Sequence, residues 1–162
     1  MDSITILAQS IHIPLLDQVN LFLENDFIFV GIVLALLLIG ERRNDKRMKI
    51  VLSLVVAALV GLGLKSAMMV DRPCFGKAYC PSDHSFPSLH ATIAFALMTG
   101  FLNKKSYIWY LLFAIFVAFS RLNFGVHTFI DIAGALPVAL LSYYAVDILW
   151  NEMEDRKNGK RN

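Results

Sequence analysis

The residues of this sequence that could do chemistry are densest between Ser120 and Asp131, in the stretch SRLNFGVHTFID. His127 and Asp131 stand four residues apart, so a helix beginning near them would place both side chains on one face. A carboxylate beside an imidazole fixes the tautomer of the ring and makes its other nitrogen a better nucleophile. Arg121 adds a planar, permanent charge that suits phosphate. Because apolar runs flank these ionisable residues, we interpret the stretch as a candidate site at a membrane boundary.

Two earlier segments carry the same kind of chemistry. Lys65 and Arg72 lie seven residues apart, which is two helical turns, so both can face one pocket. Ser88 stands two residues before His90 at an expected helix start, where unpaired backbone N–H groups attract anions. Each of these residues alone has an ordinary structural interpretation. Together, fixed cations and a helix start around two histidines suit phosphoryl transfer, in which one imidazole attacks phosphorus and the other protonates the leaving oxygen.

The elements that must position these residues are apolar helices. Of the 162 residues, 57% are hydrophobic, and they fall in blocks separated by short charged connectors. Since soluble domains are only ~45–50% apolar, we predict an all-α polytopic membrane bundle of about five transmembrane helices plus an N-terminal amphipathic helix. Pro14 should bend or split the N-terminal helix. The expected spans are residues 27–40, 50–70, 88–101, 107–119 and 132–150.

The chain is expected to divide into three parts. Residues 1–26 would form the amphipathic helix, lying at the membrane interface or packed on the bundle. Residues 27–150 would form the transmembrane domain that carries the site, and residues 151–162 a polar cytoplasmic tail. Cys74 and Cys80 share one connector, and the sequence leaves open whether they form a disulfide or stay free thiols.

The basic residues predict which way the bundle faces. With five spans, the connector 41–49, the turn 103–105 and the tail fall on one side of the membrane. These segments hold eleven of the fifteen Lys and Arg residues, so that side should be cytoplasmic. The other four are Lys65, Arg72, Lys77 and Arg121. Three of them are candidate phosphate ligands, which predicts an extracytoplasmic site, and basic residues along a membrane side give no indication of nucleic-acid binding.

The three segments together resemble the type-2 phosphatidic acid phosphatases, or lipid phosphate phosphatases, which are relatives of the vanadium haloperoxidases. The pattern of that family is K-x6-R-P, then P-S-G-H, then S-R-x5-H-x3-D. It is matched by Lys65, Arg72, Pro73, Pro87, Ser88, His90, Ser120, Arg121, His127 and Asp131. The resemblance covers the chain from about residue 50 to about residue 145. Leu89 departs from it, since the family has glycine there and a leucine adds bulk beside the phosphate.

The resemblance implies a role for each matching side chain. His127 would be the nucleophile that forms a phosphohistidine, Asp131 would orient its other nitrogen, and His90 would protonate the leaving oxygen. The phosphate would be bound by Lys65, Arg72, Ser88 and Arg121, together with backbone N–H groups near Leu89. No metal or other cofactor is expected, because fixed cations carry the charge stabilisation.

The function that this resemblance implies is hydrolysis of a lipid phosphate by an integral-membrane enzyme whose site faces the extracytoplasmic side. The bond would be the monoester or diphosphate bond of a lipid such as phosphatidate or polyprenyl diphosphate. The expected partners are that substrate and the membrane lipids, while the sequence leaves the oligomeric state undetermined. Two alternatives stay open: a lipid phosphotransferase, motivated by Leu89, and a non-catalytic membrane bundle that retains the motif. A haloperoxidase is not indicated, because those relatives are large soluble proteins.

A second histidine competes for the role of the acid. The segment Pro81-Ser82-Asp83-His84 repeats the P-S-x-H pattern six residues before His90. Pro87 prevents a regular helix from running through His84, whereas Ser88 leads directly into an apolar run. We therefore predict His90 as the proton donor. Asp83, in the same repeat, is interpreted separately as a solvated loop charge.

Overall fold

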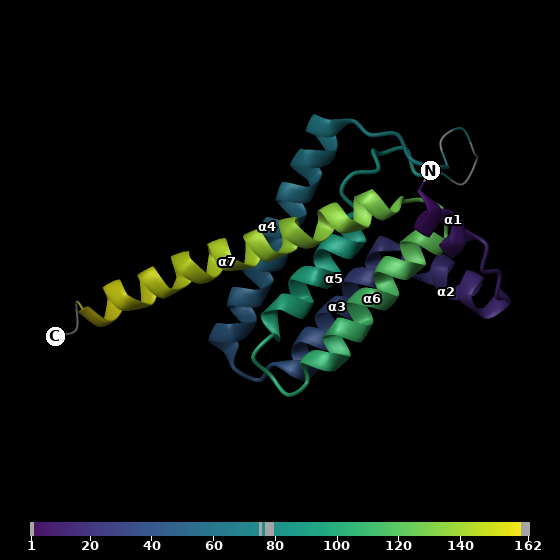
Figure 1. The fold of residues 1–162 in the computed structure, drawn as a ribbon. Coiled ribbons are helices and arrows are strands. Elements are labelled where there is room, and N and C mark those ends of the chain that lie inside the picture. Colours follow the sequence, from purple (N-terminus) through teal and green to yellow (C-terminus); the bar gives the residue numbers. More distant parts are fainter. Residues whose placement is uncertain (1, 75, 77–79, 160–162) are drawn as a thin grey trace.

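The computed structural model describes residues 2–74, 76 and 80–159, and all regular elements among them are α-helices (Figure 1). In chain order these are α1 (Ser3–Gln9), α2 (Pro14–Glu24), α3 (Asp26–Gly40), α4 (Asn44–Met68), α5 (Leu89–Gly100), α6 (Tyr107–Asn123) and α7 (Phe129–Gly159). This architecture confirms the predicted all-α class. Lys77 and the last three residues of the expected tail lie outside the described residues.

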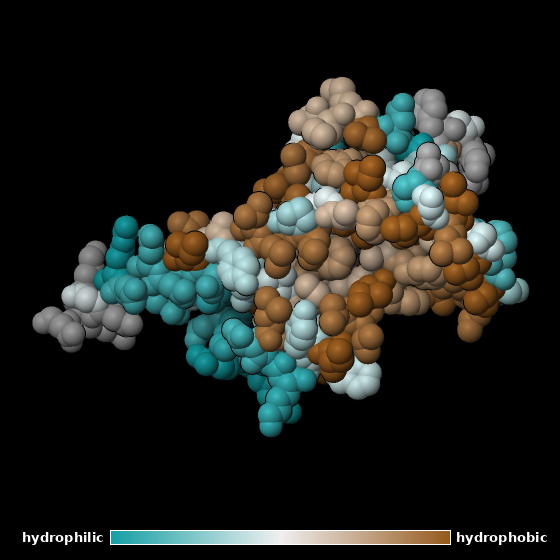
Figure 2. Space-filling model, viewed as in Figure 1, coloured by the Kyte–Doolittle hydropathy of each residue, from teal (hydrophilic) through white to brown (hydrophobic). Residues whose placement is uncertain are grey.

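Two of the described helices, α4 and α7, are long and apolar enough to cross a membrane. The bent pair of α1 and α2 would make a third span if it counts as one broken helix. The helices α3, α5 and α6 are apolar but shorter, and 12 to 17 residues rise only ~18–26 Å against a hydrocarbon core of ~30 Å. Hydrophobic residues cover the middle of the molecule, brown in Figure 2, as expected for a surface that faces lipid.

Three helix boundaries differ from the expected ones. Helix α4 begins at Asn44, inside the charged connector, and so includes residues that we placed before the second span. Helix α6 continues past residue 119, which puts Ser120 and Arg121 in its last turns instead of after its end. Helix α7 continues through the described part of the expected tail. In each case the helix extends by four to nine residues beyond the apolar block and carries polar side chains there, where hydropathy alone gives no signal.

The N-terminal segment packs on the bundle with one face and exposes the other. Pro14 splits it as predicted, and α1 and α2 meet at 110°. Thr5 and Asn20 are buried against the α6–α7 region, whereas Leu7 and Leu15 are exposed. The side chain of Asn20 donates a hydrogen bond to that of Asn123 at the end of α6 (2.7 Å). The polar face of the amphipathic pair therefore contacts α6, and its apolar face is left for lipid.

Helix α5 occupies the centre of the bundle, in contact with α4, α6 and α7. Its residues Ala91, Ala94 and Ala96 are fully buried, and such small side chains let neighbouring helices approach closely. The loop before α5 is also tightly packed, since a Cβ atom on Gly134 of α7 would lie 2.2 Å from the ring of Phe86. This packing fixes the start of α5, and with it His90, against α7.

The three basic segments lie at one end of the bundle, and the α4–α5 and α6–α7 connections lie at the other (Figure 1). Ion pairs join the segments at the basic end. Lys49 Nζ lies 2.6 Å from the Asp147 carboxylate, and Lys104 Nζ lies 2.7 Å from that of Glu41. The basic segments thus lie away from the α4–α5 and α6–α7 connections, which carry candidate site residues.

Candidate active site

A cavity of about 240 Å³ opens where the ends of α2, α3, α4, α5 and α6 meet the α4–α5 and α6–α7 connections. It is lined by Glu24, Asp26, Leu62, Lys65, Arg72, Pro81, Asp83, Leu89, His90, Arg121, Val126 and His127. Six of the eight predicted site residues are in this set, and the two histidines share the cavity. Of the other two, Asp131 lies behind His127 and Ser88 is buried without lining the cavity.

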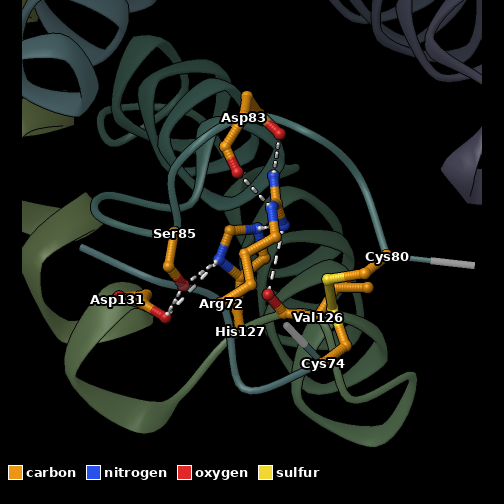
Figure 3. Close-up of a disulfide and its surroundings, with 8 residues drawn as sticks. All are labelled: Arg72, Cys74, Cys80, Asp83, Ser85, Val126, His127 and Asp131. Carbon is orange, nitrogen blue, oxygen red and sulfur yellow. Dashed lines mark hydrogen bonds and ion pairs between the residues drawn. A yellow bond between two sulfur atoms is a disulfide. The ribbon is translucent and has the colours of Figure 1, made fainter. Parts of the chain in front are cut away.

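One nitrogen of His127 faces a carboxylate. His127 Nδ1 lies 3.5 Å from Asp131 Oδ2 and 3.4 Å from Ser85 Oγ (Figure 3). The same Asp131 oxygen accepts hydrogen bonds from the Ser85 hydroxyl and from the backbone N–H of Thr128 (2.7 Å). A carboxylate held in this way favours a proton on Nδ1 and leaves the lone pair on Nε2.

The local sequence explains this geometry. His127 precedes α7, and Asp131 lies in its first turn, so the carboxylate caps the helix start as well as facing the imidazole. His127 and Asp131 therefore face each other across the start of α7, and they do not lie within one helix as we expected. The Nε2 atom of His127 lies 3.1 Å from Arg72 Nη1, so its lone pair points towards a cation on the cavity wall.

The burial of His127 lowers the pKa of its ring, so the protonated ring loses its proton easily. Burial, opposed by Asp131 and reinforced by the charge of Arg72, lowers the pKa of the ring from 6.5 to about 4. We expect its NMR titration to have a midpoint near pH 4, with the signal identified by its loss in His127→Gln. Because the pKa is higher in the unfolded chain, this group should reduce stability as pH falls from about 6.5 towards 4. A midpoint near 6.5 would contradict the burial.

Two cations converge on a carboxylate in the loop before α5. Lys65 Nζ lies 2.8 Å from Asp83 Oδ2, and Arg72 Nη2 lies 2.5 Å from Asp83 Oδ1. Arg72 also donates to the backbone carbonyls of Asp83 (3.0 Å) and Val126 (3.1 Å). Burial alone would raise the pKa of Asp83, but the bonds from Lys65 and Arg72 outweigh it and lower this pKa. A carboxylate held between two cations marks the place where a phosphoryl group can bind.

The other wall of the cavity carries Arg121 and His90. Arg121 is almost fully buried, and its Nη1 lies 2.5 Å from the Glu24 carboxylate. The ring of His90, in the first turn of α5, packs on Phe29 with centroids 4.4 Å apart. His90 Nε2 is buried and has no hydrogen-bond partner among the described atoms. This wall therefore offers a cation and a free imidazole nitrogen to a ligand.

The structure adds to what the sequence indicated about two single residues. The Asp83 side chain is half-exposed, as expected of a loop charge, and it also bridges Lys65 and Arg72. The backbone N–H of Ser88 donates to the backbone carbonyl of Asp131 (3.2 Å), and this bond joins the start of α5 to α7. The repeat of the P-S-x-H pattern, which drew attention to this loop, was the only signal in the sequence for Asp83.

The competing histidine lies outside the cavity. The side chain of His84 lines a separate, neighbouring cavity with Asp71, Gly76 and Cys80. Cys80 is in a disulfide with Cys74, which closes the connector just before the loop that carries Asp83 and Ser85 (Figure 3). This pairing decides the question that the sequence left open. Of the two candidates for the proton donor, His90 is favoured over His84, because His90 lines the same cavity as His127 and His84 does not.

Known proteins resemble this chain in sequence and in fold. A sequence model of the PAP2 superfamily matches residues 46–153. The chain is 27% identical over 152 residues to the "Putative undecaprenyl-diphosphatase YbjG" of Escherichia coli K12, covering 86% of this chain and 76% of that protein. It is 35% identical over 126 residues to an "Undecaprenyl-diphosphatase" of Sulfolobus acidocaldarius, covering 72% of this chain and 61% of the relative.

Two solved structures share the fold. One is LpxE of Aquifex aeolicus, with a TM-score of 0.71, 19% identity, and coverage of 88% of this chain and 92% of that one. The other is the first transmembrane PAP2 type phosphatidylglycerolphosphate phosphatase from Bacillus subtilis, with a TM-score of 0.70, 22% identity, and coverage of 93% and 84%. With the long apolar helices α4 and α7, this shared fold identifies an integral membrane protein.

Proposed function

The chain belongs to the PAP2 superfamily, and from this membership we propose that it is an integral-membrane lipid phosphatase working through a phosphohistidine. The observation that carries the mechanism is that His127 and His90 line one cavity together with Lys65, Arg72 and Arg121. Three fixed cations can neutralise the phosphoryl oxygens, while one imidazole attacks phosphorus and the other serves the leaving oxygen. These roles are the ones that the sequence pattern assigned.

The proposed reaction uses the contacts of these side chains. Phosphoryl oxygens replace the Asp83 carboxylate in the bonds from Lys65 and Arg72, and His127 Nε2 forms the new bond to phosphorus. The bond from phosphorus to the leaving oxygen breaks, and His90 gives that oxygen a proton. Asp131 stabilises the positive charge that develops on the His127 ring. Water, deprotonated by His90, then attacks the phosphohistidine and releases phosphate.

A polyprenyl diphosphate is the substrate that we favour, and the names of the two curated relatives support it. The apolar side chains of Leu62 and Leu89 line the cavity and would contact the first carbons of the lipid. We further propose a multi-pass topology with the cavity on the extracytoplasmic side. The gathering of the basic segments at the opposite end of the bundle supports this orientation.

A lipid phosphotransferase is the second candidate, because Leu89 replaces the glycine of the family pattern. A Cβ atom at Gly61 of α4 would lie 3.0 Å from Leu89 Cδ1, so the leucine packs into the space that this glycine leaves. The added bulk thus packs partly against α4, although Leu89 also lines the cavity. Phosphate that appears in step with substrate loss indicates hydrolysis, whereas substrate loss without phosphate indicates transfer.

The test of the proposed function is phosphate release by purified protein across a panel of lipid phosphates. The panel contains a polyprenyl diphosphate, the matching monophosphate, phosphatidate and phosphatidylglycerophosphate. We expect release from at least one of them, fastest from the diphosphate. A wild-type protein that is folded but inactive on the whole panel would favour the non-catalytic bundle.

We expect activity to persist in a chelator and to be inhibited by vanadate. The positive charge at the site comes from Lys65, Arg72 and Arg121, so charge stabilisation needs no added ion. Vanadate can occupy the phosphoryl site and accept a bond from His127 in a trigonal-bipyramidal arrangement. Phosphate release measured with EDTA, with magnesium and with vanadate checks both points. Activity that EDTA abolishes and magnesium restores would contradict the fixed-cation mechanism.

A further inference from the structure

The N-terminal helices contribute two carboxylates to the cavity, although they lie outside the segment that matches the superfamily. Glu24 ends α2 and Asp26 begins α3, and both line the cavity, whereas the match begins at residue 46. The helices are fixed to the catalytic region by polar contacts that also involve Ser120, whose hydroxyl donates to Asn20 Oδ1 (2.7 Å). Glu24 is held in place by its ion pair with Arg121 and by the packing of α2 on α6, whereas the Asp26 side chain is largely exposed.

The start of α3 directs one of these carboxylates at the candidate acid. The side chain of Asn25 caps α3 by accepting hydrogen bonds from the N–H groups of Phe27 (3.1 Å) and Ile28 (3.2 Å). One turn later, Phe29 packs on the His90 ring. Asp26 consequently lies beside the ring, with Oδ1 3.6 Å from His90 Nε2.

The charged and titratable groups that share the cavity with His90 are Glu24, Asp26, Lys65, Arg72, Asp83, Arg121 and His127. Among them, Glu24 is paired with Arg121, and Asp83 is paired with Lys65 and Arg72. Asp26 is the remaining carboxylate, and it is the one within ion-pair distance of His90 among the described residues. Its place in the first turn of α3 stabilises its negative charge through the helix dipole.

We propose that Asp26 is a positioning residue for the proton donor, and that the N-terminal helices thereby complete the active site. The proposal rests on the proposed function, since it takes His90 as the donor. A distance of 3.6 Å exceeds hydrogen-bond length, so the carboxylate acts through its charge and leaves the proton on Nε2 available to the leaving oxygen. The negative charge offsets part of the repulsion between a protonated imidazole and the three cations that share the cavity.

Comparing two leaving groups separates a role of Asp26 in proton supply from a structural role. When a lipid monophosphate is cleaved, the leaving group is an alkoxide, which needs a proton as the bond breaks. When a lipid diphosphate is cleaved at its terminal phosphorus, the leaving group is a phosphate ester, which is stable as an anion. A defect in the supply of the proton should therefore slow the monophosphate far more than the diphosphate.

The experiment compares the full-length wild type, Asp26→Asn, Asp26→Glu and Asp17→Asn on a polyprenyl monophosphate and the corresponding diphosphate. Asp17→Asn is the matched control, because it removes the same charge from an exposed position on α2. For Asp26→Asn we expect kcat on the monophosphate to fall about 10- to 100-fold, and kcat on the diphosphate less than about 3-fold. Asp26→Glu should recover most of the loss, and Asp17→Asn should match the wild type.

The pH profile of kcat, which reports the substrate complex, is the second readout. Without the adjacent carboxylate, the His90 imidazolium gives up its proton more readily, so the basic limb on the monophosphate should move to lower pH by about 0.5 to 1 unit. On the diphosphate, where His90 acts only as the base that deprotonates water, the acidic limb should move in the same direction. Because the Asp26 side chain is 86% exposed, solvent screening keeps this shift modest.

The possible outcomes separate this proposal from the proposed function. Equal losses on both substrates with an unchanged basic limb would show a structural role for Asp26 and overturn the proposal, as would full activity of Asp26→Asn. A folded wild type that cleaves neither substrate would instead overturn the proposed function itself. Thermal unfolding of each variant shows whether a loss of activity reflects a loss of fold.

Discussion

Replacing His127 with alanine is expected to lower phosphate release by about 10⁴- to 10⁶-fold, the scale seen when a catalytic nucleophile is removed. The reason is geometric: Nε2 of this residue lies at the cavity wall beside Arg72, and its other nitrogen faces Asp131. Without the imidazole, no phosphohistidine can form, and water would have to attack the substrate directly. Phosphate release from the best substrate of the panel, under saturating conditions, measures the effect.

Two controls keep this prediction specific. His127→Gln retains volume and hydrogen-bonding capacity but has no nucleophilic ring nitrogen, so we expect it to be as inactive as His127→Ala. Thermal unfolding should change little in either variant, because the ring lines a cavity and its partners Asp131 and Arg72 keep their other bonds. A His127→Ala protein that keeps a tenth of the wild-type rate would rule out a covalent role for this residue.

The second large effect is expected at His90, with His84 as the matched comparison. His90→Ala should lower kcat on a lipid monophosphate by about 10²- to 10⁴-fold, because the leaving alkoxide loses its proton donor. His84→Ala should stay within about 3-fold of the wild type, since its ring lines the neighbouring cavity and only its backbone carbonyl contacts Lys65.

The comparison has a clear opposite outcome. If His84→Ala were inactive and His90→Ala active, the proton donor would be His84, and the loop before α5 would have to turn its side chain into the main cavity on substrate binding. Both variants are read on the same monophosphate, with the diphosphate as a check that phosphoryl binding is intact.

The carboxylates that pair with the cations of the site affect how a phosphoryl group can bind. The guanidinium of Arg121 is paired with Glu24, and Lys65 and Arg72 are both paired with Asp83. An entering phosphoryl group must therefore displace carboxylates that already hold these cations. This exchange keeps buried positive charges paired in the absence of substrate, where an unpaired charge would be costly.

Local sequence patterns determined most of the helices and the identity of the central site residues. Apolar blocks bounded by charged connectors predicted the five larger helices, and Pro87 with Ser88 predicted the start of α5 within one residue. These features depend on periodicity and on helix-ending residues, which a sequence displays directly. The helical spacing expected of the two site pairs was wrong, because α4 ends at Met68, before Arg72, and α7 begins at Phe129, after His127.

Only the tertiary structure decided which distant residues support that set. Glu24 reaches Arg121 across 97 positions of the chain, Ser85 reaches Asp131 across 46, and Asp26 meets His90 through the packing of α3 on α5. Such contacts depend on how helices pack and on which buried charges need partners, and neither leaves a periodic signal in the sequence. The sequence by itself thus predicted the groups proposed to transfer a phosphoryl group, Asp131 among them, and only the fold showed that Glu24, Asp26 and Asp83 lie beside them.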